Sequence, residues 1–167
     1  MLQEIPLSLF TEPLPELLQA FAAEGLKRSK SIDCFDFVPS NPTVVYQALR
    51  TLPPGTWCEW GSGMGIQTGI AAALGFAAIG IEIDPRLAEA SRRLLDDFQL
   101  PGRILHGSYW DRDISPPADY YFVYCWPGQM NAVESHFLQV APPAAKLLIC
   151  HGADDLRCKA RPPQNVV

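Results

Sequence analysis

The chain has 167 residues, which suits one domain of ordinary size. Hydrophobic side chains make up 48% of it and charged ones 19%, so a sizeable core can form and disorder along the whole chain is excluded. The formal net charge of −5 argues against a nucleic-acid-binding surface, which needs clustered Lys and Arg. The 16 prolines are unusual, because they suit either a disordered linker or the turns of a folded domain.

The first elements expected along the chain are helical. Residues 1–36 are predicted to form an N-terminal helical segment, with a helix over Leu14–Phe21. The start of the chain lacks the basic residues of a signal peptide. A second helix is predicted to have Pro42 in its first turn and Ser40 or Asn41 as its N-cap.

Downstream, proline pairs stand just before short apolar runs of the kind that form buried strands. Proline is excluded from a central strand but can precede one, so these prolines mark connections rather than disorder. Five strands are predicted, over residues 56–60, 78–83, 103–106, 119–125 and 146–151.

Helical patterns separate most of these strands, at Ile66–Leu74, after Asp84-Pro85 and at Gln129–Val140. Strands that alternate with helices predict an α/β fold with a mainly parallel sheet. Residues 37–152 are expected to form this domain, and residues 153–167 a flexible tail.

The five cysteines are irregularly spaced and include no Cys-x-x-Cys pair. This arrangement predicts free thiols and favours the cytoplasm, which is a reducing compartment. No metal site is expected, because Cys150, His151 and Cys158 lack a fourth ligand. Residues 61–81 carry no charge, but their six glycines favour a loop, a helix and a strand over a membrane span.

The stretch Glu59–Gly65, between the first predicted strand and the next helix, carries the clearest chemistry. Its glycines, Gly61, Gly63 and Gly65, let the backbone turn tightly and let a ligand approach closely. An acid at the end of the second strand, here Glu82, can accept hydrogen bonds from both hydroxyls of a ribose.

A dinucleotide-binding Gly-x-Gly-x-x-Gly loop would need glycine where this chain has Ile66. The carboxylate of Glu59 would repel a pyrophosphate and attract an ammonium group. The pattern therefore favours S-adenosylmethionine, which carries an ammonium, a sulfonium and a ribose but no phosphate. An NAD-dependent oxidoreductase is the alternative.

With these motifs, the chain resembles the class I S-adenosylmethionine-dependent methyltransferases over about residues 37–151. The resemblance implies a Rossmann-like three-layer sandwich with a mainly parallel sheet of about five strands in the order 3-2-1-4-5. The full fold of that family has seven strands, whereas 167 residues with about fifty of them upstream leave room for five, so its C-terminal hairpin is expected to be missing. The cofactor-binding residues so implied are Glu59, Gly61, Ser62, Gly63, Gly65, Glu82 and Ile83, with Ser108 where the family often has an Asp for the adenine amino group.

A narrower resemblance rests on three segments, Phe37–Ser40, Gly80–Pro85 and Tyr121–Met130. They are similar to segments of the small protein-lysine N-methyltransferases of the ATP synthase c subunit and adenine nucleotide translocase type. In those proteins the first segment helps to close over the cofactor, which implies cofactor contacts for Phe37 and Ser40. A plain helix cap is the alternative for Ser40.

The methyl acceptor is expected beyond the fourth strand, at Trp126 and Pro127, with Tyr109 adding aromatic character. Many amino-group methyltransferases have Asn or Asp before Pro-Pro-aromatic there, whereas this chain has Cys125–Gly128. The indole of Trp126 can stack on a substrate or face its cation. Together with the narrower resemblance, this favours N-methylation of an amine such as a protein lysine as the predicted function. A small-molecule N- or O-methyltransferase and a catalytically silent binding module are the alternatives. The oligomeric state, a dimer included, is open.

Overall fold

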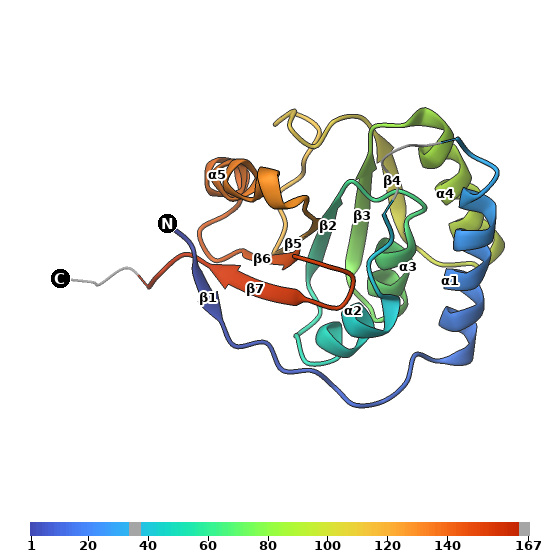
Figure 1. Cartoon of the computed structure of the whole chain (residues 1–167), viewed down its shortest axis with the longest axis horizontal. Coiled ribbons are helices and arrows are strands. Elements are labelled where there is room, and N and C mark those ends of the chain that lie inside the picture. Colours follow the sequence, from blue (N-terminus) through green and yellow to red (C-terminus); the bar gives the residue numbers. More distant parts are fainter. Residues whose placement is uncertain (34–37, 164–167) are drawn as a thin grey trace.

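The computed structural model describes residues 1–33 and 38–163, in which helices cover both faces of one sheet (Figure 1). Within these residues, seven strands have the order β1-β7-β6-β5-β2-β3-β4. The strands are β1 (Gln3–Ile5), β2 (Thr56–Trp60), β3 (Ala77–Glu82), β4 (Arg103–His106), β5 (Tyr120–Tyr124), β6 (Lys146–Cys150) and β7 (Leu156–Ala160). The helices are α1 (Glu16–Ser29), α2 (Pro42–Leu49), α3 (Ile66–Ala73), α4 (Pro85–Asp97) and α5 (Met130–Val140), with a 3-10 turn η1 (Pro127–Gln129) before α5.

Two helices begin where a capping side chain precedes a proline. The carboxylate of Asp84 accepts a hydrogen bond from the backbone N–H of Arg86 at 2.8 Å at the start of α4. The side chain of Asn41 accepts from the N–H of Thr43 at 3.0 Å at the start of α2. Proline suits the first turn because its missing N–H would have no helical partner there. The N-cap of α2 is thus Asn41, which leaves the side chain of Ser40 available for other contacts.

The five strands predicted from the sequence lie next to one another and pair in parallel. Because β2 lies between β3 and β5, the glycine loop after β2 leaves the sheet near its middle. Core residues on one face of the sheet pack with α1, α2, α3 and α4, and those on the other face pack with α5. The expected three-layer, Rossmann-like arrangement is therefore present.

The expectation of five strands without a C-terminal hairpin is wrong. β7 turns back and pairs antiparallel with β6, and β1 pairs antiparallel with β7 on its other side. β7 comes from residues expected to form a tail, and β1 from a segment expected to be helical. Cys158 in β7 and Leu2, which directly precedes β1, are both buried in the protein core. The two strands extend the sheet beyond β6, which changes its full order.

An extended segment, residues 6–15, joins β1 at the edge of the sheet to α1 (Figure 1). It is fastened to the α2 region, because the N–H of Phe10 donates to the C=O of Gln47 at 2.9 Å. The hydroxyl of Thr51 donates to the C=O of Ser8 at 3.0 Å. The segment therefore ties β1 to the helices on the α1–α4 face. No helix in the described ranges is long and apolar enough to cross a membrane.

Candidate functional site

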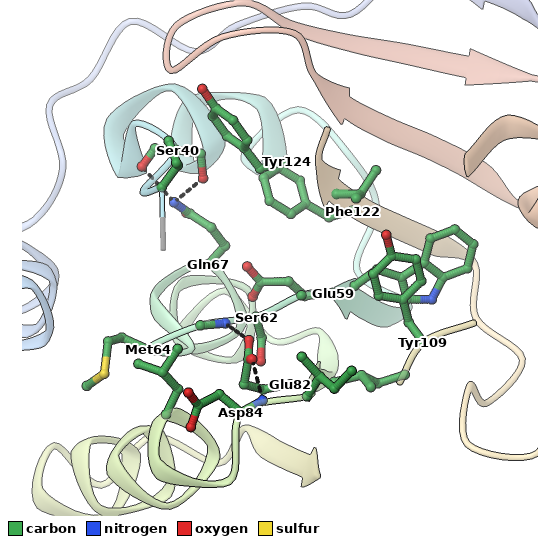
Figure 2. A pocket seen from close by; sticks show the side chains of 18 of the residues that line it. Ser40, Glu59, Ser62, Met64, Gln67, Glu82, Asp84, Tyr109, Phe122 and Tyr124 are labelled. Atoms are coloured by element: carbon green, nitrogen blue, oxygen red, sulfur yellow. Dashed lines mark hydrogen bonds between the residues drawn. The ribbon is translucent and has the colours of Figure 1, made fainter. Parts of the chain in front are cut away.

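A cavity of about 880 Å³ opens beyond the carboxyl ends of β2, β3 and β5 (Figure 2). This edge of a parallel sheet is where ligands of such folds bind, because the loops of neighbouring strands diverge there. Gly65 and Pro127 lie outside the described cavity wall, and Phe37 lies outside the described residues. The wall brings together the other predicted residues, Ser40, Glu59, Gly61, Ser62, Gly63, Glu82, Ile83, Ser108, Tyr109 and Trp126.

The loop after β2 depends on glycine at three positions. The φ angles of Gly61, Gly63 and Gly65 are +73°, +53° and +70°, in the left-handed region that other L-residues rarely adopt. The N–H groups of Gly61 and Ser62 both donate to the C=O of Ile81 in β3, each at 2.9 Å. The loop is thereby drawn back onto β3, and α3 begins directly after it.

Gly80 in β3 allows this close approach. A Cβ at this position would lie 2.6 Å from Cβ of Ser62 and 2.8 Å from Oγ1 of Thr68. The side chain of Ser62 is therefore packed against β3. Its hydroxyl is buried without a hydrogen-bond partner among the described residues.

Glu59, near the end of β2, is a buried carboxyl group with one oxygen engaged. Its Oε2 accepts hydrogen bonds from the N–H of Thr68 at 2.8 Å and from Oγ1 of Thr68 at 2.6 Å, whereas Oε1 accepts none from the described residues. Burial raises the pKa of Glu59 to about 8. The hydrogen bonds from Thr68 lower this pKa, and the nearby charge of Glu82 raises it further. A cation in the cavity would stabilise the ionised form of this group.

We expect Gly80→Ala to lower the free energy of unfolding by about 1–3 kcal/mol, the usual cost of overpacking a buried position. The added methyl group must displace Ser62 or Thr68, and Thr68 holds Glu59. Denaturant unfolding measures the change. Gly128→Ala is the matched control, because a Cβ at Gly128 meets nothing within 4 Å. Equal stability of both variants would show that the loop moves aside without cost.

Glu82 ends β3 and is also buried, but both of its oxygens already accept hydrogen bonds. Oε2 accepts from the N–H of Gly63 at 2.7 Å and Oε1 from the N–H of Asp84 at 2.8 Å (Figure 2). The carboxylate thus fastens the glycine loop to the start of α4. Each carboxylate oxygen has a second lone pair, so Glu82 can also accept hydrogen bonds from a ligand.

The described Asp, Glu, Lys and Arg side chains on the cavity wall are mostly acidic. Asp33, Glu59, Glu82 and Asp84 are acidic, and Arg86 is basic. Arg86 forms an ion pair with Asp84 at 2.7 Å, and its hydrogen bond lowers the pKa of Asp84 to about 2. The wall therefore suits a cationic or zwitterionic ligand better than a pyrophosphate.

Aromatic side chains form another part of the wall. Tyr109 stacks on Trp60, with ring centroids 5.3 Å apart and planes inclined by 6°. Trp126, which follows β5, is 48% exposed and meets Tyr124 edge to face. Burial raises the pKa of Tyr109 to about 12, so its hydroxyl is protonated at neutral pH. These side chains offer flat ring faces and hydroxyl groups to a ligand.

The two residues predicted to contact the adenine are apolar Ile83 and polar Ser108. Ile83 is 67% exposed although it is apolar, and it lies on the cavity wall. Such a side chain suits contact with a flat apolar ring. The hydroxyl of Ser108 accepts a hydrogen bond from the N–H of Trp110 at 3.3 Å, so it is partly engaged within its own loop.

Among the residues that the sequence prediction did not include, three hold parts of the site in place. Thr68 is the donor to the buried carboxyl of β2, and Gln67 donates from Nε2 to the C=O and hydroxyl of Ser40. His136 of α5 is buried, and its Nε2 lies 2.7 Å from the C=O of Tyr109. Thr68 and Gln67 follow the glycine loop by less than one turn, so their proximity to it was a usable signal. His136 reaches the site only through tertiary packing.

No protein-family model matches the sequence, and no curated protein matches it. Solved structures share its fold. PaMTH1, an SAH-bound methyltransferase from Podospora anserina, matches with a TM-score of 0.67 at 15% identity, over 83% of this chain and 63% of that one. An O-methyltransferase from Bacillus cereus in complex with SAH matches with a TM-score of 0.64 at 15% identity, over 83% and 67% of the two chains.

An RNA methyltransferase from Salinibacter ruber, in complex with S-adenosyl-L-homocysteine, matches with a TM-score of 0.57 at 16% identity. That match covers 93% of this chain and 99% of the other. The chain spans less than two thirds of the Podospora protein. Together these likenesses show that the chain has the Rossmann-like α/β fold of those methyltransferases. In the described residues, this fold contains a seven-stranded mixed sheet.

Proposed function

We propose that the protein is an S-adenosylmethionine-dependent methyltransferase. The observation that carries the proposal is the Glu59 carboxyl group, which is buried on the cavity wall beside the glycine loop and has one oxygen without a described partner. The ammonium of a methionyl group would supply that partner. The three similar proteins were solved with S-adenosylhomocysteine, the demethylated form of this cofactor, which supports the same ligand.

The other cofactor contacts follow from the same wall. Glu82 would accept hydrogen bonds from the ribose hydroxyls, Ile83 would pack on the adenine, and Ser108 would face its edge. Bound S-adenosylmethionine supplies an activated methyl group for direct displacement. The protein's part is to align the acceptor with that group and to exclude water.

For the acceptor we propose an amine, such as the side chain of a protein lysine. Trp126 and Tyr109 would face it, and Pro127 would order the turn that carries Trp126. Indole rings attract cations, and the acidic wall raises the local concentration of cationic molecules. An amine or hydroxyl of a small molecule is the alternative acceptor.

Two measurements test the proposal. Titration calorimetry with S-adenosylmethionine measures cofactor binding, and radiolabelled S-adenosylmethionine with a fractionated lysate measures transfer. We expect binding, followed by label in the protein or small-molecule fraction. No binding would contradict the proposal. Binding without transfer to protein, RNA or small molecules would instead identify a catalytically silent module.

The affinity for S-adenosylmethionine should reach its maximum near pH 8, because the pKa of Glu59 is raised to about 8 and an α-ammonium has a pKa of about 8. Below that pH, Glu59 of the free protein holds a proton that the ligand's ammonium must displace. Binding at about pH 7 should therefore release up to about one proton. Above the maximum, the ligand loses its own ammonium proton and the affinity falls.

Calorimetry in two buffers with different ionisation enthalpies counts this proton. Glu59→Gln cannot release it, so the two buffers should give the same apparent enthalpy, corrected for dilution, with this variant. A parent protein that releases no proton near neutral pH would show that Glu59 does not meet the ammonium.

A further inference from the structure

Gln67 is a cavity residue whose side chain is only partly engaged. It lies in the first turn of α3, is 3% exposed and lines the same cavity as Glu59. Its Nε2 donates to the C=O of Ser40 at 3.2 Å and to the Ser40 hydroxyl at 2.9 Å. Figure 2 shows these two bonds, which hold the end of the side chain toward the segment that enters α2.

The other end of the amide, Oε1, is buried and accepts no hydrogen bond from the described residues. The orientation of the amide follows from its partner, because the carbonyl of Ser40 can only accept and so must face Nε2. Buried polar atoms of native proteins nearly always have a partner. An acceptor left alone beside a binding cavity therefore calls for a donor that the protein itself does not supply.

The cavity is the side from which such a donor can arrive, since Gln67 is part of its wall. Of the other unpartnered atoms on this wall, the hydroxyl of Ser62 is packed against Gly80. Oε2 of Glu59 is held by Thr68, which follows Gln67 in α3, and both Glu59 and Gln67 line the cavity, so each presents one acceptor oxygen without a described partner at the same cavity. An ammonium carries three N–H donors, more than one carboxylate oxygen accepts.

We propose that Oε1 of Gln67 is the second acceptor for the ammonium group at the methionyl end of the cofactor, which it shares with Glu59. The inference rests on the proposed function, because it takes S-adenosylmethionine as the ligand. It makes Gln67 a specificity-determining residue that recognises the amino-acid end of the ligand and not its adenosine. Through Nε2, the same amide joins the bound ligand to Ser40.

Two ligands distinguish contacts to the amino-acid end of the cofactor from contacts to its adenosine. S-adenosylhomocysteine has both, whereas 5′-methylthioadenosine lacks the amino-acid part. We expect Gln67→Met to weaken binding of S-adenosylhomocysteine about 10- to 100-fold, as for a lost hydrogen bond to a charged group. Binding of 5′-methylthioadenosine should be unchanged. Calorimetry with the full chain measures both affinities, and Gln67→Leu, which has a different shape, repeats the test.

Gln47→Met is the matched control, since Gln47 donates to the C=O of Glu12 and lies outside the cavity wall. It should bind both ligands as the parent does. An equal loss for both ligands in the Gln67 variants, or an unchanged affinity for S-adenosylhomocysteine, would overturn the role of Gln67 and leave the proposed function standing. A parent protein that binds neither ligand would overturn the proposed function, and this role with it.

Discussion

Glu82→Ala should weaken S-adenosylmethionine binding by a factor of about 100 or more. The substitution removes the carboxylate proposed to bind the ribose, and a hydrogen bond to a charged group contributes about 1.5–3 kcal/mol. It also leaves the N–H groups of Gly63 and Asp84 without the oxygens to which they donate at 2.7 and 2.8 Å. The glycine loop would then lose one of its three hydrogen bonds to β3. Titration calorimetry with the full chain measures the loss.

Glu89→Ala is the matched control for this experiment. Glu89 is an acid of α4 that pairs with Arg93 at 2.9 Å, outside the cavity wall. It should bind the cofactor as the parent does. Glu82→Gln should lie between the parent and Glu82→Ala, because the amide retains one acceptor oxygen. Unchanged affinity in Glu82→Ala would contradict the ribose site, and unfolding curves of all variants distinguish lost contacts from a lost fold.

The sequence could place the glycine loop and Glu82 at the cavity because their signals are local in sequence. Positions that need a positive φ, such as Gly61 and Gly63, are usually occupied by glycine, so the sequence itself predicts where the loop turns. An acid at the end of a strand, such as Glu82, is placed by the topology of a parallel sheet. The free oxygen of Gln67 and the contact of His136 with the loop after β4 depend on side-chain packing between distant elements. No periodicity in the sequence encodes such contacts.

The central strands were predictable for a related reason. β2, β5 and β6 each have four consecutive buried residues that are mostly apolar, and a proline pair precedes each of them. β7 contains Arg157 and Lys159 within five residues, and β1 is three residues long. Neither segment is apolar or long enough to show a strand period. Their positions come from pairing with β6, which is a tertiary effect.

Removal of residues 1–5 should lower the free energy of unfolding by about 3 kcal/mol and promote self-association. Burial of a leucine such as Leu2 contributes about 1.5–3 kcal/mol, and hydrogen bonds of the β1–β7 pair add to it. Without β1, the backbone groups of Cys158–Ala160 face solvent and can pair with another chain. Denaturant unfolding measures the first effect and sedimentation velocity the second.

Two point variants separate packing from edge protection. Leu2→Ala should cost about 2 kcal/mol without self-association, because the strand edge stays covered. Leu9→Ala should cost little, since Leu9 is 50% exposed whereas Leu2 is 9% exposed. A monomeric deletion variant with the stability of the parent would show that β1 adds nothing to the sheet.

The deletion should also weaken cofactor binding, because β7 is linked to the cavity through one turn. The N–H of Asn41 donates to the C=O of Ala153 at 3.0 Å, and its Nδ2 donates to Oδ1 of Asp154 at 2.6 Å. Ala153 and Asp154 lie in the turn between β6 and β7. Asn41 directly follows Ser40, which accepts a hydrogen bond from the cavity residue Gln67. If β7 loses its pairing with β1, the turn between β6 and β7 becomes more mobile, and so does the part of the cavity wall at Ser40. Leu2→Ala keeps β1 paired, so it should retain the affinity that the deletion loses.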